Sequence, residues 1–225
     1  MLTESVMLNP ARPHELMLEL KAIFSSVIGV SRLYAFGSMA RGDWDRWSDI
    51  DLLIVTAFEG QFLGVWEAFH AAKPVIHHHP FSRAEPSGAH ALGNVFEGES
   101  VFHCLDLNFL TEAEANMSSA LERFGPMKEL YRFETPAASD ALDETPFIQE
   151  LSPAEEAISF NIHFTKKNVK RLLRGHDVRA EVNKYADLLR RQMAVYPPDY
   201  RVVGGNIGYV AHTYLAIVDE LLPES

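Results

Sequence analysis

The chain has 225 residues, of which 47% are hydrophobic and 23% charged, and its formal net charge is −11. This composition is typical of a soluble globular protein, and no apolar run approaches the ~18 residues that a membrane helix needs. The acidic balance argues against a sequence-independent nucleic-acid binder, because such proteins neutralise phosphates with Lys and Arg. It suits a cationic partner, although acidity often serves only to keep a protein in solution.

The first part of the chain predicts a helix and two strands. Apolar residues at helical spacing indicate a helix over 13–27, with a proline at its first position. Short apolar runs over 33–36 and 52–55 each have the length of a buried strand. The polar stretch between the two runs predicts a turn that joins the strands.

Two short motifs flank this turn, Gly37-Ser38 at its start and Asp49-x-Asp51 at its end. Alternate residues of a strand share a face, so the two carboxylates are expected to lie roughly 6–7 Å apart. Carboxylates held that close repel each other unless a cation lies between them, and Mg²⁺ commonly combines such oxygens with substrate phosphates. Glycine permits close approach of a ligand, and the serine N–H and hydroxyl suit a phosphate. Arg41 is either a further phosphate ligand or a solvated side chain.

The next segment predicts a helix over 58–72 and a strand over 75–77. Residues 77–79 are three adjacent histidines, which cannot all face one metal ion because alternate strand residues point apart. We interpret them as the end of a strand, with His77 or His79 as candidates to line a substrate cleft. Residues 80–100 show no clear periodicity, which favours a functional loop such as a lid, or a loop that contains a short helix near its middle.

A further strand is predicted over 101–110, where apolar residues surround a third carboxylate, Asp106. Alternation places Cys104, Asp106 and Asn108 on one face of this strand and apolar side chains on the other. Thr111 and the two glutamates that follow it are typical of a capped helix start. Cys104 is the only cysteine, so an internal disulfide is excluded and cytoplasmic residence is the simplest interpretation.

The order Gly-Ser, a spacer of about ten residues, Asp-x-Asp and a later carboxylate resembles the nucleotidyltransferase superfamily. The resemblance covers the first half of the chain. It implies ATP or another nucleoside triphosphate as co-substrate, two Mg²⁺ ions, transfer of a nucleotidyl group and release of pyrophosphate. It assigns catalysis and metal binding to Asp49, Asp51 and Asp106, and nucleotide binding to Gly37, Ser38 and Arg41.

Residues 135–150 are rich in Pro, Ala, Ser and acidic residues, which is typical of a linker. We therefore expect a nucleotidyltransferase catalytic domain over 1–134 and a helical bundle domain over 151–225. The predicted fold class is α+β, a mixed sheet with flanking helices followed by the bundle.

Three amphipathic helices are expected in the C-terminal part, and short breaks between them favour a bundle. Ser152 and Glu155 form a capping box for the first helix, Asp177 is expected to cap the second, and the third is predicted over 206–222. One or two basic residues of these helices are expected to reach the triphosphate, the candidates being Lys166, Lys167, Lys170, Lys184 and Arg190.

The helical C-terminal part is most similar to that of antibiotic nucleotidyltransferases. This similarity implies transfer of AMP to a hydroxyl of a small acceptor such as an aminoglycoside or lincosamide, and a role in antibiotic resistance. One alternative is an antitoxin that adenylylates a HEPN toxin protein, and another is a nucleotide-binding regulator without transfer activity. No membrane partner is expected. The sequence does not determine the base preference, the modified hydroxyl or the general base. It is compatible with both a monomer and a homodimer.

Overall fold

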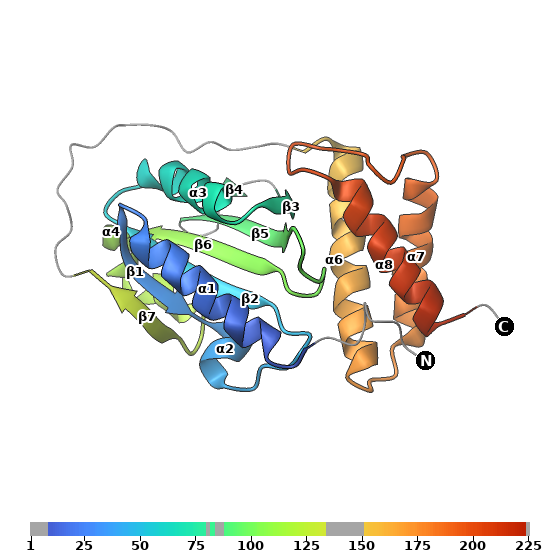
Figure 1. The fold of residues 1–225 in the computed structure, drawn as a ribbon, viewed down its shortest axis with the longest axis horizontal. Helices are drawn as coiled ribbons and strands as arrows, with labels where there is room; N and C mark the ends of the chain where they lie inside the picture. The colour runs from blue at the N-terminus through green and yellow to red at the C-terminus, as the bar shows by residue number, and fades with distance from the viewer. Residues whose placement is uncertain (1–8, 80–81, 84–87, 134–150, 224–225) are drawn as a thin grey trace.

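The computed structural model describes residues 9–79, 82–83, 88–133 and 151–223. A sheet flanked by helices forms the larger part, and three long helices stand beside one end of it (Figure 1). The elements of the larger part are α1 (Arg12–Ser26), β1 (Val30–Ala35), α2 (Gly37–Arg41), β2 (Ile50–Thr56), α3 (Gln61–Ala72), β3 (Val75–His77), β4 (Ser82–Arg83), β5 (Ala89–Phe96), β6 (Leu105–Thr111), α4 (Glu112–Ala115), α5 (Ser118–Glu122) and β7 (Lys128–Arg132). The three helices are α6 (Pro153–Leu173), α7 (Arg179–Met193) and α8 (Ile207–Leu221). The α+β class is confirmed, whereas the predicted linker over 135–150 lies outside the described residues.

β2 and β6 form the centre of the sheet and pair in parallel, whereas the other described strand pairs are antiparallel. The strand order is β3-β5-β6-β2-β1-β7, and β4 pairs with β5 at the side. At the start of both central strands, buried apolar residues alternate with half-buried polar ones, Asp51 in β2 and Asp106 in β6. The alternation predicted around Asp106 is therefore confirmed. It brings two carboxylates to the same end of neighbouring strands.

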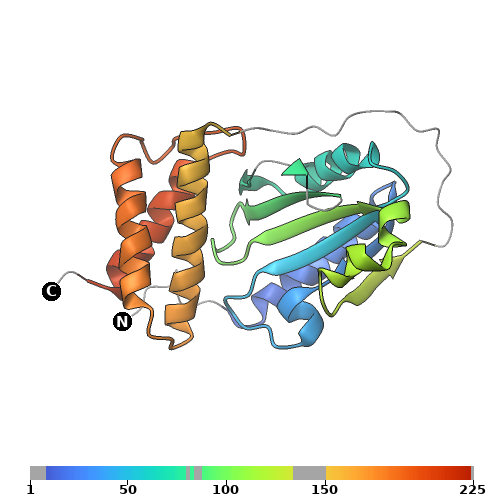
Figure 2. The same cartoon turned by 180° about the vertical axis from the view of Figure 1, so that it is seen from behind.

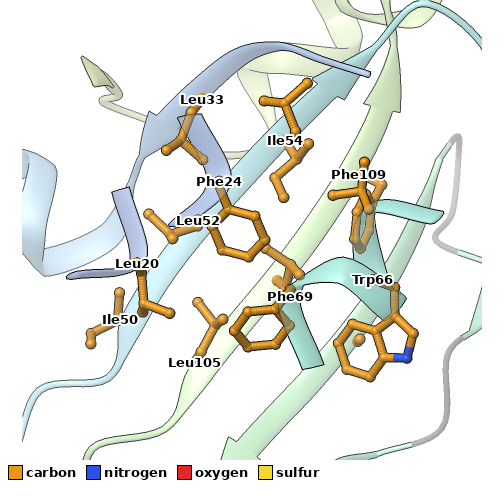
Figure 3. Packing of buried hydrophobic residues seen from close by; sticks show 14 of the residues in the cluster. Leu20, Phe24, Leu33, Ile50, Leu52, Ile54, Trp66, Phe69, Leu105 and Phe109 are labelled. Carbon is orange, nitrogen blue, oxygen red and sulfur yellow. The ribbon is translucent and has the colours of Figure 1, made fainter. Parts of the chain in front are cut away.

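Helices cover both faces of the sheet, which is why its central strands are apolar over most of their length. α1 and α3 pack on one face, where apolar side chains from helices and strands interlock (Figure 3). Phe24 of α1 and Phe69 of α3 stack there with ring centroids 5.0 Å apart. α4 and α5 lie on the opposite face (Figure 2), over a smaller cluster that includes Leu53 and Leu110. The sheet is thus held rigidly between two apolar layers.

The bundle of α6, α7 and α8 is the one predicted, and α6 stands across the end of the sheet at which β2 and β6 begin (Figure 1). Ser152 and Glu155 form the expected capping box at the start of α6. The bundle also packs against the loop before β6, because the Tyr214 hydroxyl donates a hydrogen bond of 2.6 Å to the Val101 carbonyl. Phe102, from the same loop, is buried in the hydrophobic core of the bundle. No helix in the described part of the chain is long and apolar enough to cross a membrane.

Two local predictions in the first half of the chain are wrong. The stretch after Gly37 begins with the short helix α2 and not a plain turn, because good helix formers follow and the Gly42 N–H closes on the Ser38 carbonyl at 2.9 Å. Residues 89–96 form strand β5, where a loop or a short helix was expected. Pairing with β3 and β6 on its two sides overrides the weak local pattern of this segment.

Two further details differ from the sequence-based expectations. β7 pairs with β1 at the edge of the sheet, and its residues are half-buried or exposed, so it lacks the apolar signal of a strand. α7 begins after Val178 with no side-chain cap, so the cap expected from Asp177 is absent. Asn206 does cap α8, by accepting a hydrogen bond from the Tyr209 N–H.

Candidate active site

The three predicted carboxylates converge where β2 and β6 begin. Asp51 and Asp106 are direct register partners across the parallel pair. Asp49 comes just before β2, at the point where the Ile50 N–H donates to the Cys104 carbonyl at 2.9 Å. The pairing of two strand starts therefore fixes the backbone positions of all three residues beside side chains of α6.

Gly37 brings the first turn of α2 against Asp51. Its φ angle is +60°, a left-handed conformation that favours glycine, and a β-carbon at this position would lie 2.2 Å from Oδ2 of Asp51. The Phe36 N–H donates to the Asp51 carbonyl at 3.1 Å, which fastens the same two segments together. The Gly-Ser motif and the second aspartate are thus parts of one site.

Like charges surround Asp51. Burial raises the pKa of its carboxyl to about 7, and the neighbouring carboxylates Asp106 and Asp49 add to the rise. A carboxyl group with two negative neighbours in a half-buried position is poorly stabilised when ionised. A divalent cation at this position would relieve the repulsion.

Asp49 has the opposite surroundings, because side chains of α6 reach its carboxylate. Lys170 donates from Nζ to Oδ1 at 2.5 Å, Lys166 Nζ lies 3.5 Å from the same oxygen, and the Cys104 thiol donates to it at 3.1 Å. Burial alone would raise the pKa of Asp49, but the two lysines outweigh it and hold that pKa well below its usual value. The carboxylate is ionised and paired with cations of the helical bundle.

A cavity of about 610 Å³ opens on the Gly37 side of the carboxylates. Its lining residues are Gly37, Ser38, Arg41, Asp43, Asp45, Trp47, Ser48, Asp49, Asp51, Lys170 and Arg174. Arg174 is bound to Asp45 at 2.6 Å within this lining, whereas Arg41 is half-exposed and donates to Asp43 at 3.0 Å. The cavity therefore combines the start of α2, four carboxylates and three cationic side chains, of which Lys170 and Arg174 come from the end of α6 and its C-cap. This set suits a polyanion bound together with a metal ion.

A second cavity, of about 580 Å³, opens on the Asp106 side between the sheet and the bundle. Four histidines contribute to its wall, His77, His79, His90 and His163, beside apolar residues and Lys166. Burial lowers the pKa of all four rings, that of His79 to about 4 and that of His77 to about 3. These rings are neutral at pH 7, so they act as hydrogen-bonding groups and not as charges.

The donor set suits magnesium, since Asp49, Asp51 and Asp106 offer hard oxygen ligands and Asp51 is destabilised by its negative neighbours. Among the described residues, however, no group of three acidic, histidine or cysteine side chains is arranged to hold a metal ion. Asp49 is turned toward Lys170 and Lys166. A metal site therefore needs one carboxylate to leave its lysine partners. The described histidines give no zinc site either.

Residues 16–86 match the family model described as a nucleotidyltransferase domain. The matched region contains the Gly-Ser and Asp-x-Asp motifs and ends before Asp106. The match supports the expected nucleotidyltransferase superfamily, whereas it does not decide the antibiotic-specific subtype. A comparison with curated proteins finds no similar sequence.

The solved structures that are similar to this chain resemble it only distantly. A cytoplasmic RNA terminal U-transferase is 13% identical, with a TM-score of 0.33 over 88% of this chain and 46% of that one. Cid1, described with RNA terminal uridylyl transferase activity, is 14% identical, with a TM-score of 0.36 over 90% of this chain and 46% of that one. The chain thus spans about half the length of these two proteins. The values are too low to transfer a substrate.

The structure brings together every predicted site residue, since Gly37, Ser38, Arg41, Asp49 and Asp51 line the first cavity and Asp106 lines the second. Sequence reasoning did not single out Lys166 and Lys170 among the basic residues of the bundle. Their spacing of four places them on one helix face, and both are buried. The sequence does not distinguish buried lysines from exposed ones. The structure was therefore needed to select these two lysines.

Proposed function

We propose that the protein is a magnesium-dependent nucleotidyltransferase that moves a nucleoside monophosphate, AMP first among candidates, from a triphosphate to a hydroxyl of a small acceptor. The observation that carries the proposal is the position of Asp51 and Asp106 as strand partners between two separate cavities. A transfer reaction needs two substrates that meet at one set of charged groups. The two cavities meet this requirement.

The triphosphate would occupy the cavity on the Gly37 side. There Gly37 and Ser38 offer the backbone N–H groups and hydroxyl of a turn to phosphate oxygens, while Lys170 and Arg174 approach from the bundle. Asp49, Asp51 and Asp106 would hold the magnesium ions, which when bound supply positive charge at the α-phosphorus. Placement and charge account for most of the catalysis expected from such a site.

The acceptor would occupy the histidine-lined cavity, whose volume is within the range of sites for drug-sized ligands. From there an acceptor hydroxyl can approach Asp106, which lines the same cavity. His79 also lines it and is a second candidate to accept the hydroxyl proton, because its neutral ring can take up a proton. An aminoglycoside or lincosamide antibiotic would meet the requirement for a hydroxyl, and we propose these as the first acceptors to screen.

The experiment that tests the proposal has two stages. Calorimetric titration of ATP and GTP in the presence of Mg²⁺ should show binding to the wild-type protein and its loss in an Asp49→Asn/Asp51→Asn variant. Acceptors are then screened for pyrophosphate release with the nucleotide that binds better. Asp187→Asn, an exposed site on α7, is the matched control for charge and should leave both readouts unchanged.

Other outcomes point to other functions. Nucleotide binding without pyrophosphate release from any small acceptor, together with labelling of a co-purified helical protein, would favour the protein-adenylylating antitoxin. Binding without any transfer would favour a nucleotide-binding regulator. Absence of nucleotide binding in the wild-type protein, with and without acceptor, would overturn the proposal.

A further inference from the structure

Oδ1 of Asp49 is occupied by donors from the chain itself. Lys170 and the Cys104 thiol donate hydrogen bonds to this oxygen, and Lys166 Nζ lies 3.5 Å from it. Lys170 also donates to the Phe102 carbonyl at 3.1 Å, which holds its ammonium beside Asp49 in the nucleotide-free protein. Both lysines are buried, with 8% and 4% of Lys166 and Lys170 exposed, so water does not offer them an alternative partner.

An ammonium group and a divalent cation compete for the same carboxylate. Both are attracted to its lone pairs, and their mutual repulsion at contact distance is strong in a poorly hydrated site. Oδ1 of Asp49 can serve as a metal ligand only after Lys170 has moved away. Lys170 lines the cavity that contains Ser38 and Arg174. A triphosphate bound in that cavity would offer the Lys170 ammonium another anion to pair with in place of Asp49.

We propose that Lys170 is a positioning residue that holds Asp49 in the nucleotide-free protein and exchanges this carboxylate for the triphosphate, so that metal and nucleotide bind together as one complex. This inference rests on the proposed function, because it takes the Gly37-side cavity as the nucleotide site. It follows that the protein without nucleotide is a poor binder of divalent metal. The nucleotide removes the competing lysine and brings the metal with it.

Lys166 does not share this role. It lies one helical turn before Lys170 and lines the histidine-lined cavity, where the Cys104 sulfur accepts its hydrogen bond at 3.2 Å. When Lys170 leaves Asp49, Lys166 stays near the carboxylate from the acceptor side. The site therefore keeps one lysine to orient Asp49 while the other moves.

The test is a titration of the nucleotide-free protein with Mn²⁺, followed by electron paramagnetic resonance or calorimetry. The Lys170→Met variant should bind Mn²⁺ about tenfold more tightly than the wild-type protein, because the competing ammonium is absent. In the presence of metal it should bind a non-hydrolysable ATP analogue about tenfold more weakly, because one phosphate partner is absent. A purely structural role would not move the two affinities in opposite directions.

Two controls separate charge from packing. Lys167→Met removes a neighbouring exposed lysine, which lies over the Phe164 ring at 5.8 Å, and should change neither affinity. Lys170→Arg keeps the charge and should keep weak metal binding. Thermal unfolding confirms that each variant is folded, and Lys170→Gln replaces Lys170→Met if the latter is not.

Equal Mn²⁺ affinity of Lys170→Met and the wild-type protein would overturn the exchange. Tighter Mn²⁺ binding that persists when Asp51→Asn is added would also overturn it, because the metal would then occupy another place. Failure of the proposed transfer activity gives a different result. The metal affinities then follow the expected pattern, while no acceptor yields pyrophosphate.

Discussion

Gly37 and Asp51 are in contact across the start of α2 and β2, and a β-carbon on Gly37 would lie 2.2 Å from the Asp51 carboxylate oxygen. The 13 intervening residues therefore bring the chain back to the same place in space, and the two parts of the predicted motif lie together. The contact leaves no room for any side chain at residue 37. It also limits the directions in which the Asp51 carboxylate can point.

The first prediction concerns Gly37→Ala. We expect this variant to lose pyrophosphate release almost completely and to lose about 1–3 kcal/mol of unfolding free energy, because the methyl group displaces Asp51 and the φ of +60° is strained for alanine. The matched control is Gly42→Ala. Gly42 has a φ of +80°, but a β-carbon there meets no atom within 4 Å. Gly42→Ala should therefore lose a similar amount of unfolding free energy through backbone strain, while its activity stays intact. Equal activity of the two variants would show that the contact with Asp51 is not needed.

The second prediction concerns Asp51→Asn. The neutral amide should lower the rate of pyrophosphate release about 10²–10³-fold, because a charged group at the reacting centre is lost. The same change should raise the melting temperature of the metal-free protein, because it removes a carboxyl group that burial and two negative neighbours destabilise. Activity assays and thermal unfolding in a chelator measure the two effects. A variant that is active, or one that melts below the wild-type protein, would contradict this account of the site.

The third prediction concerns an ion pair away from both cavities. The Arg32 Nε and the Ser31 hydroxyl donate to the Glu112 carboxylate at 3.1 and 2.6 Å. Burial opposes the charge, but these hydrogen bonds outweigh it and lower the pKa of Glu112. A carboxyl group with a lowered folded-state pKa stabilises the fold above its unfolded pKa, near 4.3, and this contribution disappears as the pH falls through the folded value.

Glu112→Gln should therefore cost about 1–3 kcal/mol of unfolding free energy at pH 7 and progressively less below about pH 4. Urea unfolding of the wild-type protein and of Glu112→Gln between pH 3 and pH 8 measures this difference in unfolding free energy. Glu97→Gln, at an exposed position, is the control and should show no such dependence. Activity should be unchanged in both variants, because neither residue lines a cavity of the site. A constant difference across the pH range would contradict the ionic origin of the stabilisation.

The sequence predicts much of this site because its parts are local. Gly37-Ser38 and Asp49-x-Asp51 each lie next to an apolar strand, and Asp106 lies within a third apolar run, so strand alternation alone orients them. β5 was not predictable from the same signal, since its bulge between Ala91 and Asn94 interrupts the alternation. The contacts of Lys170 with Asp49 depend on how α6 packs against the sheet, which no local pattern encodes.

The histidine-lined cavity also required the tertiary structure. Its lining residues include members of β3, β4, β5 and β6 on one side and of α6 and α8 on the other, and they are far apart in sequence. Among the described lining residues, Asp106 and Glu156 are the acidic ones, and Lys166 is already paired with Asp49. The rest of the wall combines neutral imidazoles with apolar side chains such as Leu92, Val95 and Ile162. Such a wall solvates a cation poorly.

The fourth prediction follows from this wall and separates the two proposed acceptor classes. A hydroxylated acceptor with an apolar part and at most one cationic group, as in lincosamides, should be used with a kcat/KM about a hundredfold higher than a polycationic aminoglycoside. Each additional buried ammonium without a carboxylate partner costs several kcal/mol, so polycations should be used less efficiently. Pyrophosphate release with a panel of neutral, singly charged and polycationic acceptors measures the ratio. Glu156→Gln should weaken use of a singly charged acceptor and leave a neutral one unaffected, because only the former can pair with this carboxylate. Equal use of polycations by the wild-type protein would show that other carboxylates complete the acceptor site.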